Sequence, residues 1–165
     1  MVGNPDSLRD FFESTRLWYR FIEFNEPVKT VEQAKQKVPI EKIAKSIVLV
    51  DYDGAPLLAI VPAQNRVHFA KIKMVLNVKD VRLATPEETL KYSGYAAGGV
   101  PPFNKIQRIL LDPLVLDNET SIVGGGNVNR LVEVRTQDMV STLRPFIVNI
   151  VDWTTLQASH SYIKE

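Results

Sequence analysis

The pattern of hydrophobic and polar positions changes period several times along the chain. Apolar residues at helical spacing predict a short helix over 7–15, and the aromatic and branched run after it predicts a strand over 16–24. Thr30 begins a capping-box pattern that predicts a helix over 31–38, which Pro39 would end. The first 38 residues therefore predict a helix, a strand and a second helix.

The clearest hydrophobic pattern lies in the middle of the first half. A helical turn over 40–44 leads into the apolar run 46–52, and Asp53-Gly54 is a strong hairpin signal before the second apolar run, 56–63. Unbroken apolar runs of this kind are typical of central strands that are covered on both faces. We therefore expect these two strands at the centre of a sheet.

The second half mixes short strands with single helices. The segment 67–77 predicts a strand end that passes into a helix, and Thr85-Pro86 predicts a capped helix to Tyr92, stopped by Gly94. Further strands are expected at 81–84, 106–112, 113–116 and 146–153, with a pair over 120–134 joined by a glycine-rich turn and a helix from Thr136 to Leu143.

The predicted elements show no regular strand–helix–strand alternation, and no linker divides the chain. The predicted fold class is therefore α+β, with a single domain over 1–152 built on a mixed, mostly antiparallel, twisted sheet with short flanking helices. A polar tail is expected over 153–165.

Composition excludes several kinds of site. The 165 residues contain no cysteine and two histidines, which excludes disulfides, thiolate zinc sites, cysteine nucleophiles and multi-histidine metal sites. The longest apolar runs fall short of the ~20 residues that span a bilayer, and the N-terminus is too charged for a secretory signal. We expect a soluble cytoplasmic protein with no metal or organic cofactor and no membrane partner.

Positive charge is concentrated locally rather than over the whole chain. The formal net charge is +1, which gives no general nucleic-acid signature. The stretch 66–82 nevertheless holds Arg66, Lys71, Lys73, Lys79 and Arg82 against Asp80 alone. This basic face could meet phosphates; the alternative is an ordinary solvated helix face.

Lys45 is the first candidate for chemistry, because it stands where a helical turn enters a buried strand. A lysine is costly to bury without a partner, so a lysine at this position can direct its ammonium into a cleft. There it could bind a carbonyl oxygen, a carboxylate or a phosphate as a compact charge. The alternative is a surface lysine that favours the end of a helix.

Two glycine-rich segments are the other candidates. Gly98 and Gly99 can leave main-chain N–H groups free for an oxyanion or phosphate, and the prolines after them stiffen the loop; the alternative is a rigid connection. The run 124–127 matches neither a dinucleotide fingerprint nor a phosphate-binding loop, and a plain hairpin turn is its alternative. No nucleophile elbow is present.

Six segments occur in an order that resembles a known family. They are TVEQA (30–34), IAKSIVLV (43–50), VHFAKIKMVL (67–76), RLATPEE (82–88), GYAAGGVPPF (94–103) and GGGN (124–127). In this order they resemble the YbaK/ProX-like proteins, free-standing relatives of the editing domain of bacterial-type prolyl-tRNA synthetases. The resemblance covers about residues 8–150, and the lysine with both glycine segments is specific as a set. Asn104 stands where relatives usually carry glycine, so we expect the loop exit to bend differently.

The resemblance implies an aminoacyl-tRNA deacylase that acts in trans on a mischarged tRNA, with a small amino acid such as alanine or cysteine on tRNA-Pro. It assigns the catalytic roles to Lys45, Gly98 and Gly99. The implied substrate-binding residues are Thr30, Ser46, Val100, Pro101, Gly124, Gly125, Gly126 and Asn127. The implied tRNA-binding residues are Arg66, Lys71, Lys73 and Lys79. The implied partners are the acceptor end of an aminoacyl-tRNA and, as a further candidate, a synthetase.

Two other functions stay open at this point. A non-catalytic module could use the same cleft to hold a tRNA end or an aminoacyl ligand without turnover. A hydrolase for another small ester or amide is the third candidate, and it would act without the RNA, whereas a deacylase should lose activity when the acceptor stem is removed.

Overall fold

The computed structural model of the protein describes residues 5–152, so the predicted tail 153–165 lies outside the described residues. The helices are α1 (Pro5–Thr15), α2 (Val31–Ala34), α3 (Phe69–Leu76), α4 (Pro86–Ser93) and α5 (Thr136–Leu143), with 3-10 turns η1 (Ile40–Lys42) and η2 (Pro113–Asp117). The strands are β1 (Tyr19–Glu23), β2 (Ala44–Asp51), β3 (Pro56–Pro62), β4 (Val81–Leu83), β5 (Ile109–Leu111), β6 (Thr120–Asn127), β7 (Arg130–Arg135) and β8 (Phe146–Ile147).

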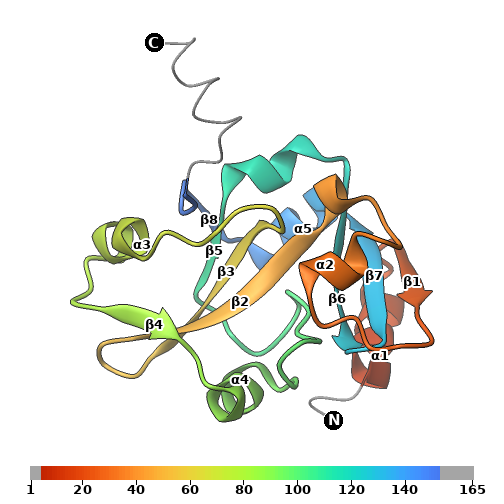
Figure 1. Cartoon of the computed structure of the whole chain (residues 1–165), viewed down its shortest axis with the longest axis horizontal. Coiled ribbons are helices and arrows are strands. Elements are labelled where there is room, and N and C mark those ends of the chain that lie inside the picture. The colour runs from red at the N-terminus through yellow and green to blue at the C-terminus, as the bar shows by residue number, and fades with distance from the viewer. Residues whose placement is uncertain (1–4, 153–165) are drawn as a thin grey trace.

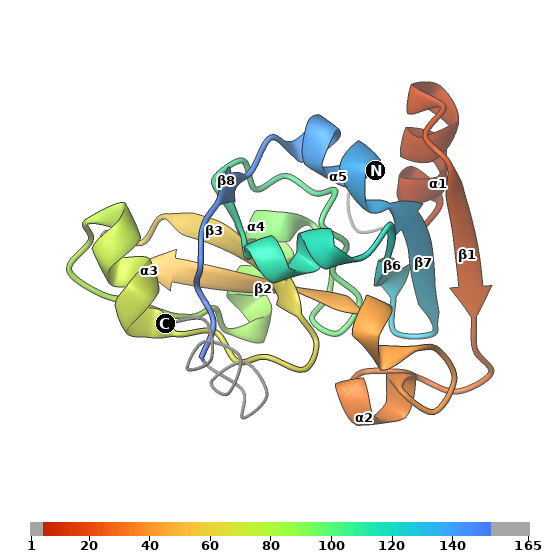
Figure 2. The same cartoon turned by 90° about the horizontal axis from the view of Figure 1, so that it is seen from above.

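The strands are divided between two sheets. One has three strands in the order β1-β7-β6, all antiparallel, and the other has five in the order β4-β2-β3-β5-β8, in which β5 runs parallel to both β3 and β8. Figure 2 shows the smaller sheet and α3 at opposite ends of the molecule. The predicted α+β class with a mixed, mostly antiparallel arrangement is confirmed.

The hairpin of β2 and β3 lies at the centre of the larger sheet, as predicted. Successive side chains of these strands enter different core clusters, because a strand presents alternate residues to opposite faces. Val48 and Leu58 belong to the cluster that also contains α1, whereas Leu49 and Leu57 belong to the cluster beneath α3. Both faces are therefore covered, which explains the unbroken apolar sequence.

The strand predicted over 113–116 is wrong, because these residues form η2. Asp112 caps this turn: its Oδ1 accepts a hydrogen bond from the N–H of Leu114 at 2.9 Å, and Pro113 occupies the first position. The second carboxylate oxygen of Asp112 accepts from the N–H of Ile150 at 2.9 Å, so one buried side chain organises two segments.

Other predicted elements are shorter in the structure than the sequence pattern indicates. The helix over 31–38 is regular only to Ala34 and continues as turns. Within the described residues, the last strand forms a ladder only over Phe146–Ile147, and Val151 adds an isolated antiparallel bridge to Val67. The predicted helix from Thr136 to Leu143 is confirmed as α5, with Arg135 at its N-cap and the hydroxyl of Thr136 paired with that of Ser121 at 2.7 Å.

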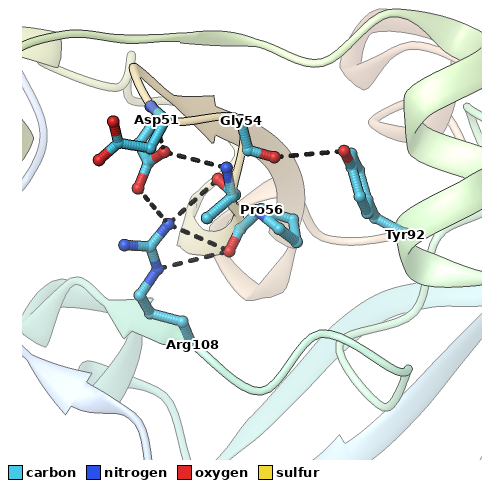
Figure 3. Close-up of polar contacts among 7 residues, drawn as sticks. Asp51, Gly54, Pro56, Tyr92 and Arg108 are labelled. Atoms are coloured by element: carbon cyan, nitrogen blue, oxygen red, sulfur yellow. Dashed lines mark hydrogen bonds and ion pairs between the residues drawn. The ribbon is translucent and has the colours of Figure 1, made fainter.

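Arg108 closes the far end of the β2–β3 hairpin (Figure 3). Its Nη2 donates to Oδ2 of Asp51 at 2.9 Å and to the carbonyl oxygens of Ala55 and Pro56 at 3.1 and 3.2 Å. The side chain of Asp51 is only 5% exposed. Burial alone would raise the pKa of Asp51, but hydrogen bonds from Ala55, Arg108 and Asp53 outweigh it and lower the pKa below its ordinary value.

Arg108→Ala is expected to destabilise the protein by about 1.5–3 kcal/mol, the contribution of hydrogen bonds to a charged group. A carboxyl whose pKa is lowered by folding stabilises the folded state above its unfolded pKa, and this stability is lost as the pH falls through the folded pKa. In the variant the pKa of Asp51 rises, so acid unfolding begins at a higher pH. Urea melts between pH 3 and pH 7 measure both effects, and an unchanged acid midpoint would contradict the role of Arg108.

Candidate functional site

A pocket of about 250 Å³ lies where α2, the first residues of β2, the loop after α4 and the end of β6 meet. The residues that line it are Val28, Lys29, Thr30, Val31, Ala34, Ile43, Ala44, Lys45, Ser46, Gly98, Val100, Val123, Gly124 and Leu131. In Figure 1, α2 lies beside the smaller sheet, away from α3 on the left. Segments distant in sequence thus meet at one corner of the molecule.

The predicted capping box fixes the start of α2 at this corner. Oγ1 of Thr30 accepts from the N–H of Gln33 at 3.2 Å, and Oε1 of Gln33 accepts from the N–H groups of Thr30 and Lys29 at 3.3 and 2.9 Å. These bonds hold Thr30 and Lys29 at the pocket.

Lys45 brings a positive charge without a partner into the pocket. No described residue forms an ion pair or a hydrogen bond with its ammonium. Burial lowers the pKa of Lys45, and the nearby positive charge of Arg66 lowers it further. The ammonium is therefore available to a ligand that carries a negative charge or a carbonyl oxygen.

The two glycine segments form one wall by packing main chain against main chain. A Cβ added at Gly124 would overlap the carbonyl oxygen of Val100, and one at Gly99 would lie 2.7 Å from the main chain of Asn127. The N–H of Gly126 donates to the carbonyl of Gly99 at 2.9 Å. The glycines are needed for this close approach.

The glycine run is therefore a strand end and not the predicted turn. Residues 124–127 belong to β6, with an irregular register between Gly124 and Asn127, and the turn follows at 128–129. Within the predicted catalytic pair, Gly98 lines the pocket with a φ of 94°, whereas the N–H of Gly99 donates to the carbonyl of Ala96 at 3.2 Å.

The predicted substrate-binding residues separate into two groups. Thr30, Ser46, Val100 and Gly124 line the pocket together with Lys45 and Gly98. Pro101, Gly125, Gly126 and Asn127 are not among its lining residues, and neither is Gly99, which lies against the main chain of Asn127.

Asn104 ties the exit of the loop that carries Gly98. Its Nδ2 donates to the carbonyl of Pro101 at 2.7 Å, and its Oδ1 accepts from the N–H of Ile106 at 2.8 Å. Asn104 therefore links Pro101 to Ile106 across the exit of the loop, before the chain enters β5.

The predicted tRNA-binding residues differ in the contacts that they make. Most of the basic stretch is engaged elsewhere. The contacts are those of Lys71 with Asn149 and Val151, Lys73 with Asp80, Lys79 with the ring of Tyr52, and Arg82 with Glu88. Arg66 differs, because its charge acts on Lys45.

Sequence patterns missed the apolar half of the pocket. It consists of Val28, Val31, Ala34, Ile43, Val123 and Leu131. Each of these residues has the appearance of an ordinary core position in sequence, so no local signal marks them. Lys29 was missed as well, although it directly precedes the recognised cap Thr30.

The charged side chains among the described residues that line the pocket are all cationic. Among the described residues that line it, none carries a carboxylate or an imidazole. Within residues 5–152, no three histidine, aspartate or glutamate side chains gather in a group that could hold a metal ion. In the same range no helix has both the length and the apolar character needed to cross a membrane. The site can therefore polarise a carbonyl and stabilise negative charge, but it supplies no strong base.

Comparison with known sequences identifies relatives over most of the described chain. The family model of the aminoacyl-tRNA editing domain matches residues 25–142. Proline–tRNA ligase of Thermotoga neapolitana is 34% identical over 100 residues, which cover 59% of this chain and 17% of the ligase. The ligase of Thermosipho africanus is 35% identical over 101 residues, which cover 59% and 18%. The chain spans less than a fifth of the length of these ligases.

A solved structure shares the whole architecture. A candidate trans-editing enzyme for prolyl-tRNA synthetase superposes with a TM-score of 0.79 at 23% identity, covering 90% of this chain and 97% of that chain. At this identity the likeness shows a common fold.

Proposed function

The chain belongs to the aminoacyl-tRNA editing domain family, and on this premise we propose that it hydrolyses the ester of a mischarged tRNA, acting in trans. The observation that carries the proposal is the ammonium of Lys45, which has no partner among the described residues. Lys45 lines the pocket together with Gly98 and Gly124 of the two glycine segments. A partly buried charge of this kind is stabilised when a ligand supplies the missing partner.

The proposed mechanism uses electrostatic stabilisation. Lys45 binds the carbonyl oxygen of the ester or the terminal phosphate, and the main chain at Gly98 supports the negative charge that develops when water attacks. Because the pocket offers no carboxylate or imidazole among its described residues, the vicinal hydroxyl of the terminal ribose assists the water. The bond between the acyl carbon and the ribose oxygen breaks, one proton of the attacking water passes to that ribose oxygen and the other to solvent, and the amino acid leaves as its carboxylate.

The proposed substrate carries a small amino acid such as alanine or cysteine, on tRNA-Pro. The apolar half of the pocket would hold its side chain, and the total volume of about 250 Å³ must also admit part of the terminal nucleotide. Each methylene is worth only ~1–3 kcal/mol in such a pocket. The assignment to tRNA-Pro is supported by the names of the relatives, which are proline–tRNA ligases.

Deacylation of a panel of charged tRNAs tests this function. Alanyl-, cysteinyl-, seryl- and threonyl-tRNA-Pro are compared with correctly charged prolyl-tRNA-Pro and with substrates lacking the acceptor stem. Rapid release of one amino acid that requires the stem is the expected result. Binding of every tRNA without release would overturn the proposal and favour a non-catalytic module.

Arg66 is proposed as the contact with the tRNA backbone that lies nearest the pocket. Arg66→Ala is expected to weaken tRNA binding about tenfold and to reduce the salt slope of log Kd by about 1, because one phosphate contact is lost. Lys73→Ala is the matched control, since Lys73 lies on α3 and faces Asp80. Equal effects of the two substitutions in filter-binding titrations would show that the predicted α3 lysines contribute to tRNA binding as much as Arg66 does.

A further inference from the structure

The register of β2 against β3 fixes the direction of its main-chain groups. The N–H of Asp51 donates to the carbonyl of Ala55, and the N–H of Ala63 donates to the carbonyl of Ile43, both at 2.9 Å. Odd-numbered residues of β2 therefore hold the bonds to β3, since bonded pairs alternate along an antiparallel ladder. The N–H and C=O groups of the even-numbered residues, Ser46 among them, point to the opposite edge.

That opposite edge is open at Ser46. Further along, β4 occupies it: the carbonyl of Val48 accepts from the N–H of Ala84 at 3.0 Å, and β4 pairs with residues 49–51. At Ser46 no main-chain hydrogen bond from another described segment reaches the edge. Ser46 itself lines the pocket, so the pocket adjoins this edge.

The side chain of Ser46 also lacks a partner. Its Oγ is buried and accepts or donates no hydrogen bond within the described residues, although the residue as a whole is partly exposed. Leaving a buried hydroxyl unpaired costs about 1–3 kcal/mol. Three polar groups of one residue are therefore available beside Lys45.

Resting on the function proposed above, we propose that Ser46 binds the aminoacyl group of the substrate through its main-chain N–H and C=O groups. The aminoacyl group would then occupy the place of a residue in a neighbouring strand. An aminoacyl ester carries an ammonium donor and a carbonyl acceptor on adjacent carbons. The C=O of Ser46 accepts from the ammonium, and its N–H donates to the ester carbonyl. The hydroxyl, turned outward about the Cα–Cβ bond, accepts a second ammonium proton.

The charged groups of the pocket indicate that uncharged oxygen atoms bind this ammonium. Lys29 and Lys45 line the pocket, and no carboxylate is present among its described lining residues. A substrate ammonium can therefore be satisfied only by uncharged oxygen atoms there. Ser46 offers two of them at one position.

Ser46→Ala tests the hydroxyl. We expect kcat/KM for alanyl-tRNA-Pro to fall about tenfold, the value of one hydrogen bond at the upper end of its range, while Tm stays equal or rises because an unpaired buried oxygen is removed. Ser46→Thr, which keeps the hydroxyl, should restore most of the activity. Ser121→Ala is the matched control: its hydroxyl is paired with Thr136, so Tm should fall while kcat/KM is kept. Wild-type kcat/KM in Ser46→Ala would overturn the role of the hydroxyl.

Amide hydrogen exchange tests the main chain without requiring turnover. Saturation with the non-hydrolysable 3′-alanylamido-3′-deoxyadenosine is expected to slow exchange of the Ser46 N–H at least about tenfold. The comparison ligands are adenosine alone and the analogue in which a hydroxyl replaces the α-amino group of the alanyl moiety. The hydroxyl analogue is expected to bind more weakly than the alanyl analogue. Binding of the alanyl analogue with unchanged Ser46 exchange would overturn the inference even if deacylation occurs. Absence of deacylation in the tRNA panel, by contrast, bears only on the proposed function.

Discussion

Lys45→Ala is expected to lower kcat/KM for deacylation by about 100- to 1000-fold, the usual loss when one donor to a developing oxyanion is removed. The proposed mechanism has no second cation in the same position, and no described lining residue can act as a base in its place. Single-turnover hydrolysis of the reactive member of the tRNA panel is the measurement. Activity within a few-fold of wild type would contradict the mechanism.

The same substitution should leave the fold as stable or make it more stable. Burial and Arg66 lower the pKa of Lys45, so between its folded and unfolded pKa values the unfolded chain binds more protons and stability rises with pH. At neutral pH the charged lysine therefore costs stability, which alanine removes. The activity of the wild type should correspondingly fall as the pH rises through the lowered pKa, below the ordinary lysine value of 10.5.

Lys42→Ala is a matched control for Lys45→Ala. Lys42 lies three residues earlier, faces Glu133 at 3.6 Å and does not line the pocket. It should retain wild-type activity. Lys45→Arg keeps the charge but spreads it over a planar fork, so it should recover only part of the rate.

Gly124→Ala is expected to reduce stability and activity together. The added methyl group would overlap the carbonyl oxygen of Val100, and both partners are main chain, so the loop must move away. Overpacking of this kind costs about 1–3 kcal/mol, which corresponds to a fall in Tm of about 2–4 °C per kcal/mol. Because the displaced loop also carries Gly98, kcat/KM should fall more than about tenfold, a loss typical of misplaced catalytic groups.

Gly54→Ala is the control that distinguishes the stability cost of a left-handed backbone conformation from the effect of steric overlap at Gly124. Gly54 has a φ of 85° but no atom within 4 Å of an added Cβ, and it lies at the hairpin tip away from the pocket. It should lose about 1–2 kcal/mol from the left-handed conformation alone and keep full activity. If Gly124→Ala behaved like Gly54→Ala, the wall would not depend on the glycine.

Local signals predicted the elements that local physics determines. The Asp53-Gly54 hairpin and the Thr30 and Thr85 capping boxes occur as expected, because their hydrogen bonds join residues close in sequence. The signal for η2 was also present, since Asp112 and Pro113 repeat the cap-and-proline pattern of the helix at 85–86. The apolar run after Pro113 was given more weight than its cap.

The candidate site was only partly predictable, because its walls depend on contacts between distant segments. Lys45 was marked by its position at the start of a buried strand. The run 124–126 was misassigned as a turn because the reason for its glycines is the approach of a loop about 25 residues earlier, which periodicity and turn propensity do not contain. The apolar lining carries no sequence signal until the fold brings it together.

Where Gly124 meets Val100, the close contact is made by main-chain atoms and not by a side chain. Diversification of substrate preference within this scaffold is therefore confined to the opposite wall, where Val28, Val31 and Ala34 contribute replaceable side chains. A combinatorial library intended to accept a new amino acid belongs at these three positions. Homologues that edit different amino acids should accordingly vary most there and least along the glycine wall.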